Sequence, residues 1–153
     1  MLTVGTDSYV TLAEAELLVT DYHASADPKR VLWTALSNAD KEAYLRQGLA
    51  SLEELVLVGT KISSTQTLQF PRNISEYEVI SMDVPTAVKR AQVELALQAL
   101  QGVPERVQLQ RQGVSSASVG HASESYTGAR TLMESPESYS LMKPYLAGGL
   151  RIV

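Results

Sequence analysis

The chain has 153 residues, of which 44% are hydrophobic and 20% charged, which favours one globular domain and excludes a wholly disordered chain. It has no cysteine, which excludes disulfides and thiolate metal sites, and no apolar run near the ~18 residues that cross a bilayer, so we expect neither export nor a membrane partner. The net charge is -4, from 13 basic and 17 acidic residues, and this sign disfavours a dedicated nucleic-acid binder.

The first two predicted helices have recognisable caps. Thr11 and Glu14 have the residue types and the spacing of a capping box, so a helix begins there, and it ends before Asp27. Asp27 can cap a second, short helix that has Pro28 at its first position and reaches Leu36.

A third helix is predicted from a cap at Asp40 to about Val58. Its apolar residues form one stripe at helical spacing, namely Leu45, Leu49, Leu52 and Val56. Gly48 inside this helix costs about 1 kcal/mol relative to alanine, so we expect a neighbouring backbone to pack closely against it. Gly59 then supplies a left-handed stop.

A long polar segment separates the third helix from the fourth. Residues 60–84 lack a helical period and are rich in Ser, Thr, Gln, Asn and Pro, which predicts a loop with one short extended piece at 67–70. Such loops are usually functional or covered by a partner. The fourth helix, 85–101, closes at Gly102 and is apolar over more than half its circumference, so it is either central or buries a second face against another chain.

The remaining residues change pattern. Past Pro104 apolar and polar residues alternate at 107–110, Gly113 can turn the chain, and residues 114–126 are rich in Ser and Val. This pattern is typical of a β-hairpin, and a loop and a short helix at 138–146 follow it.

The predicted elements give a mainly α fold, a small helical bundle of about four to five helices with a β-hairpin arm in the C-terminal third. We expect one domain overall, in which residues 1–102 form the bundle core and residues 103–153 form the hairpin arm and a C-terminal docking segment. Residues 1–101 hold 8 basic and 13 acidic residues, and residues 102–153 hold 5 and 4, so the helical part is acidic and the tail nearly neutral.

No motif for catalysis or cofactor binding is visible. His23 and His121 lie far apart without a neighbouring ligand motif, which argues against a metal site. Gly59 and Lys61 are not adjacent, as a phosphate loop requires, and the Gly-x-Ser-x-Gly elbow of serine hydrolases is missing. We therefore expect no enzyme and no cofactor.

Basic residues interleaved with aromatic ones would indicate single-strand binding, because bases stack on rings while cations follow the phosphates. The candidates are three aromatic residues with nearby arginines, namely Trp33 with Arg30, Tyr44 with Arg46, and Phe70 with Arg72. Trp33 and Tyr44 lie in predicted helices, where packing in the core is the commoner use.

The most specific string is Gln66-Thr67-Leu68-Gln69-Phe70-Pro71-Arg72, which follows the third helix. With the opening at residues 7–15, the Val84-Pro85 start of an alanine-rich helix, and the 114–126 hairpin ahead of residues 141–146, it resembles the head-tail connector, or adaptor, family of tailed bacteriophages. Some members of that family are labelled DnaT-like single-strand-binding proteins. Phe70 stands where Trp is more usual in such proteins.

This resemblance implies a structural connector subunit in the neck of the virion, made in the bacterial host cytoplasm. Its partners would be copies of itself in a ring of about twelve subunits, the portal protein, and a neck or tail-completion protein. Packaged double-stranded DNA would pass through the ring without specific binding, which suits an acidic surface. The alternative is a single-stranded DNA-binding replication accessory protein, which the family label and the aromatic residues favour and the net charge disfavours.

Two segments are predicted to bind partners. In the loop, Pro71 fixes the backbone after Phe70, and Arg72 can reach carboxylates or the terminal carbonyls of a helix. The apolar tip follows two glycines and would gain little by folding back alone, so its residues are assigned to docking: Leu150, Arg151, Ile152 and Val153. Because the chain is acidic, we expect no useful affinity for single-stranded DNA.

Overall fold

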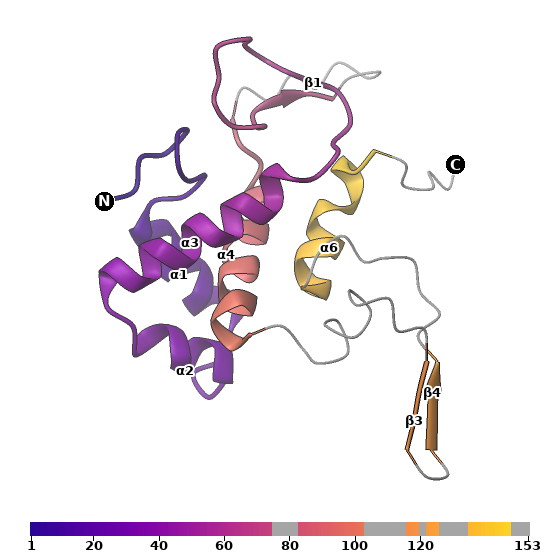
Figure 1. The fold of residues 1–153 in the computed structure, drawn as a ribbon. Helices are drawn as coiled ribbons and strands as arrows, with labels where there is room; N and C mark the ends of the chain where they lie inside the picture. The colour runs from indigo at the N-terminus through magenta and orange to yellow at the C-terminus, as the bar shows by residue number, and fades with distance from the viewer. Residues whose placement is uncertain (75–82, 103–115, 120–121, 126–134, 148–153) are drawn as a thin grey trace.

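The computed structural model describes residues 1–74, 83–102, 116–119, 122–125 and 135–147 (Figure 1). The fold is mainly α with a small antiparallel hairpin, as predicted. The central helix, α4, is contacted by four others, and the bounds of the five are α1 (Leu12–Tyr22), α2 (Pro28–Thr34), α3 (Asn38–Glu53), α4 (Thr86–Gln101) and α6 (Pro136–Met142). None of the described helices is long and apolar enough to span a bilayer.

The first two helices begin as predicted and the third begins earlier. The Thr11 hydroxyl accepts from the Glu14 amide at 3.1 Å, and the Glu14 carboxylate accepts from the Thr11 amide at 2.8 Å. Asp27 caps α2. In α3, however, the cap is Ser37, whose hydroxyl accepts from the amide of Asp40 at 3.2 Å, so the predicted cap lies one turn inside the helix.

The predicted end of α3 was wrong. The helix stops at Glu53, and the chain that follows pairs with the segment after α6: the Val58 amide donates to the Tyr145 carbonyl at 2.8 Å, and the Ala147 amide donates to the Val56 carbonyl at 2.9 Å. Val56 therefore leaves the apolar stripe and is 73% exposed. Pairing with a distant segment has overridden the local helical period.

Helix α4 is central within a single chain. Every residue from Ala91 to Gln98 is buried. The helices that cover them are α1, α2, α3 and α6. A Cβ at Gly48 would lie 2.4 Å from the Gln92 carbonyl oxygen and 2.9 Å from the Ala96 nitrogen, so the predicted close packing of α3 on α4 is confirmed. The broad apolar surface of α4 thus needs no second chain to cover it.

Two apolar clusters flank α4. One joins α3, α4, α6 and the loop after α3, and its buried members include Tyr9, Leu49, Leu52, Phe70, Leu95 and Met142. The other joins α1, α2, α3 and α4, with Val19, Trp33, Leu45, Val93 and Leu97. The C-terminal third, which the sequence assigned to a hairpin arm and a docking segment, therefore contributes α6 to the core, and the short 3-10 helix η1 (Lys143–Tyr145) packs partly against it.

The loop after α3 carries a short antiparallel pair, β1 (Thr60–Lys61) with β2 (Arg72–Asn73), instead of an extended piece at 67–70. Gly59 has a φ of +75°, as a left-handed stop requires. The second pair, β3 (Ser116–Val119) with β4 (Ala122–Ser125), lies apart from the helices in Figure 1. The predicted alternating strand at 107–110 lies outside the described residues.

Candidate functional site

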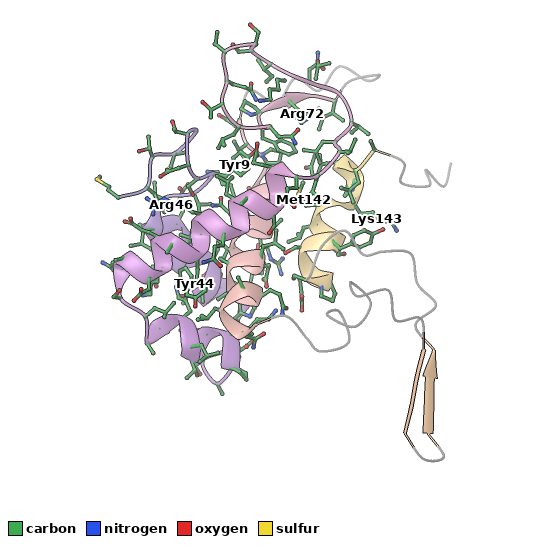
Figure 2. All side chains as sticks on the ribbon, in the orientation of Figure 1. Tyr9, Tyr44, Arg46, Arg72, Met142 and Lys143 are labelled. Carbon is green, nitrogen blue, oxygen red and sulfur yellow. The ribbon has the colours of Figure 1, made fainter. Side chains whose placement is uncertain are left out.

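The two loop residues predicted to bind a partner lie together inside the chain. Phe70 is 3% exposed, and its ring makes edge contacts with Tyr9 and Tyr145, at centroid distances of 6.0 and 5.4 Å. Arg72 is also buried, and Figure 2 shows it within the loop beyond the end of α3. The predicted docking tip, residues 150–153, lies outside the described residues and stays a prediction.

Arg72 uses its donors on the backbone that leaves α3. Its Nε donates to the Val58 carbonyl at 3.0 Å, and its Nη2 donates to the Gly59 carbonyl at 2.7 Å. Gln69 completes the arrangement, because its side-chain Nε2 donates to the Glu53 and Leu55 carbonyls at 2.9 and 3.0 Å. Since the last carbonyls of a helix lack intrahelical partners, the string at 66–72 closes α3 and holds the extended segment after it.

The aromatic residues singled out for base stacking are packed instead. Trp33 is fully buried, with the Lys41 ammonium 5.8 Å from its ring, and Tyr44 packs against the cluster around Trp33. Among the aromatic side chains of the described residues, Tyr22 is the most exposed, at 50%.

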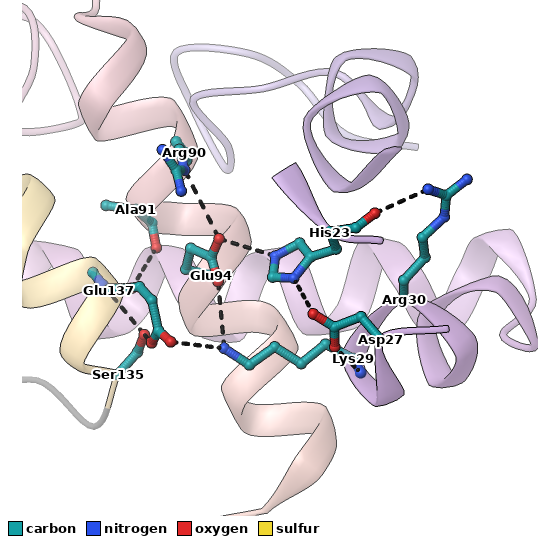
Figure 3. Close-up of polar contacts among 10 residues, drawn as sticks. His23, Asp27, Lys29, Arg30, Arg90, Ala91, Glu94, Ser135 and Glu137 are labelled. Carbon is teal, nitrogen blue, oxygen red and sulfur yellow. Dashed lines mark hydrogen bonds and ion pairs between the residues drawn. The ribbon is translucent and has the colours of Figure 1, made fainter. Parts of the chain in front are cut away.

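A buried carboxylate is surrounded by basic side chains (Figure 3), one of which, Arg90, also lies over the Tyr22 ring. Glu94 on α4 is 2% exposed, and its oxygens lie 3.0 Å from His23 Nε2, 3.5 Å from Lys29 Nζ and 3.8 Å from Arg90 Nε. Burying a carboxylate is costly unless it is paired, so these contacts fix the positions of all three basic groups.

Two further carboxylates extend this cluster across four helices. His23 Nδ1 lies 2.9 Å from the Asp27 carboxylate, and Lys29 Nζ lies 3.5 Å from that of Glu137 on α6. The hydrogen bond from His23 and the backbone N–H of Lys29 hold the pKa of Asp27 below its usual value. The other ring nitrogen of His23 faces Glu94, so the ring lies between two carboxylates.

At the end of α1, three residues form what we call the Tyr22 site: Tyr22, Arg90 over its ring, and Arg30 on the carbonyls of the last helical turn. The Arg90 guanidinium carbon lies 3.6 Å from the centroid of the Tyr22 ring. Arg30 Nη1 donates to the Thr20 and His23 carbonyls at 3.3 and 2.9 Å, at the end of α1, where helix carbonyls favour a cation. Such a site can stack on a planar ligand and bind an anion beside it.

Sequence reasoning missed this site. Tyr22 ends the first helix and Arg90 comes from a helix far along the chain, so no local spacing links them. No group of three or more His, Cys, Asp or Glu side chains in the described part of the chain is placed to hold a metal ion.

Comparison with known proteins places the chain in a family. A family model with the description "Putative DnaT-like ssDNA binding protein" matches residues 2–152. The match spans nearly the whole chain, and the protein therefore belongs to this family. No curated protein and no solved structure matches the chain.

The prediction of a bacteriophage head-tail connector is thereby corrected, because the matching family is described by single-strand binding. This correction also removes the predictions that depended on the connector role: a place in the virion, a ring of subunits, portal and neck partners, and the passage of DNA without binding. The features that suggested assembly have internal explanations: α4 is covered by helices of the same chain, and the 66–72 string closes α3. The negative net charge, from which we expected no useful affinity for single-stranded DNA, pointed away from this family.

Proposed function

We propose that this protein binds single-stranded DNA as a non-catalytic accessory protein in DNA replication. The observation that carries the proposal is the family match over residues 2–152. The exposed surface adds support, since the described residues include cations that have no carboxylate partner, namely Arg30, Lys61 and Lys143.

The charge balance sets the expected mode of binding. A chain with a net charge of -4 makes few phosphate contacts, and each contact with single-stranded DNA contributes a slope of about -0.7 to the dependence of log K on log salt. Base stacking is tolerant of sequence and does not release counterions. We therefore expect moderate affinity, little sequence preference and a shallow salt dependence.

The test is an anisotropy titration with a labelled single strand of about 16 nucleotides, the upper end of common site sizes. A duplex of the same sequence is the control. We expect saturable binding with a dissociation constant on the order of micromolar at about 50 mM salt, and weaker binding to the duplex, whose bases are already stacked. Absence of saturable binding to the single strand at that salt concentration would refute the proposal.

A further inference from the structure

We propose that the Tyr22 site is where a nucleotide of single-stranded DNA binds, with its base stacked on the face of the Tyr22 ring that Arg90 leaves open and its phosphate on Arg30. This rests on the proposed function and names the residues that perform it. Three properties of the site support it: an accessible ring, a guanidinium held over one face of that ring, and a second guanidinium with free donors that is bound to the carbonyls at the end of the same helix.

The ring is accessible although it is already in contact with a cation. Half of the Tyr22 surface is open to solvent, whereas Trp33 and Phe70 are at most 3% exposed. A tyrosine in a folded protein exposes an apolar face at some cost, and a base can cover that face. Among the described aromatic residues, Tyr22 is thus the best placed to receive a base.

Arg90 is positioned before any ligand arrives. Its guanidinium contacts the ring at 3.6 Å and lies 3.8 Å from Glu94, which His23 and Lys29 hold in turn. The Arg90 side chain is 29% exposed, and its Nε is buried beside Glu94. Because the Arg90 contact already orders the Tyr22 ring, stacking a base on the open face of the ring loses little conformational entropy.

Arg30 lies on the other side of His23 from Arg90 (Figure 3). The Thr20 and His23 carbonyls hold one nitrogen of its guanidinium, and these two residues flank Tyr22 in the chain. Within the described residues its Nε and Nη2 have no hydrogen-bond partner, so they can donate to a phosphate in the bidentate geometry that arginine favours.

The charges of the cluster favour binding by base stacking over binding of the phosphate backbone in a basic groove. Glu94 and Glu137 offset Arg90 and Lys29, which leaves Arg30 as the one arginine or lysine of the site without a carboxylate partner. An acidic protein can bind a single strand in this way, because the ring supplies affinity and one guanidinium supplies the phosphate contact.

The first test replaces the ring. In the anisotropy titration, Tyr22→Ala should weaken binding roughly tenfold or more, the usual loss for one stacked base, whereas Tyr22→Phe, which keeps the ring, should stay within about twofold. The matched control is Leu17→Ala on the same helix, a 63% exposed apolar side chain that should leave affinity unchanged. Circular dichroism checks that every variant is folded.

The second test separates the two arginines. Arg90→Lys keeps the charge near Glu94 but loses the planar group, so it should weaken binding without changing the salt slope. Arg30→Gln should make the slope shallower by about 0.7, while Lys143→Gln, an exposed lysine on η1, should not change it.

The outcomes distinguish this site from the proposed function. If the wild-type protein binds the single strand and Tyr22→Ala binds equally well, the site is wrong and the function stands. If the wild-type protein does not bind, both are wrong. An Arg30→Gln slope equal to that of the wild type would overturn the phosphate contact.

Discussion

Arg72 and Arg90 are used in opposite ways. Arg72 is buried and donates hydrogen bonds to the carbonyls of Val58 and Gly59, so it fixes the path of the backbone. Arg90 is partly exposed, pairs with one carboxylate and lies over the half-exposed ring of Tyr22. The first arrangement is complete within the chain, and the second leaves a ring and a planar cation at the surface. Changes near Arg72 should therefore alter stability, and changes near Arg90 should alter binding.

The largest expected effect is a difference in stability loss between replacing the ring of Phe70 and replacing the ring of Tyr22. Phe70→Ala should lower the free energy of unfolding by about 3 to 5 kcal/mol, because it removes a buried ring that contacts Tyr9 and Tyr145. Tyr22→Ala should cost less than about 1 kcal/mol, since its ring is half exposed. Urea denaturation followed by circular dichroism measures both. Equal losses would mean that Tyr22 is as much a part of the core as Phe70.

The next effect concerns the buried arginine. Arg72→Met keeps much of the side-chain volume but leaves the Val58 and Gly59 carbonyls without their donor, and we expect a loss of about 2 to 3 kcal/mol. Arg72→Lys should recover only part of this, because one ammonium cannot reproduce the planar fork. In the same denaturation assay, a loss below about 0.5 kcal/mol for Arg72→Met would show that other groups or water satisfy these carbonyls.

The sequence allowed prediction of the features that depend on near neighbours in the chain. The capping box at Thr11 and Glu14 and the cap at Asp27 need only residues within one turn, so their types and spacing were sufficient. The close approach at Gly48 followed from the cost of a glycine inside a helix, which packing had to offset. The mainly α fold is the sum of such local signals.

The rest depends on contacts between distant segments. The end of α3 at Glu53 follows from pairing of the segment around Val56 with the chain after α6, which no periodicity in α3 can reveal. The string containing Phe70 and Arg72 was singled out for the connector resemblance and for partner binding, whereas in the structure it closes α3. The Tyr22 site needs residues from α1, α2 and α4 together, and it therefore appears only in the folded chain.

The smallest expected effect tests the carboxylate cluster behind Tyr22 through its pH dependence. The pKa of Asp27 is lowered by the hydrogen bond from His23 and by the backbone N–H of Lys29, so ionised Asp27 stabilises the fold above the unfolded pKa of about 4, and this contribution disappears as the pH falls through the lower folded value. Asp27→Asn keeps a good helix cap but removes the charge, and it should cost about 0.5 kcal/mol near neutral pH. The difference from the wild type should shrink below about pH 4, because protonation then removes the charge from the wild-type protein as well.

Asp21→Asn, an exposed change on α1, is the control and should show no such trend in urea denaturation series at several pH values. A difference for Asp27→Asn that stays constant down to about pH 2 would mean that Asp27 acts through its cap alone and that its charge contributes nothing to holding His23 behind the Tyr22 ring.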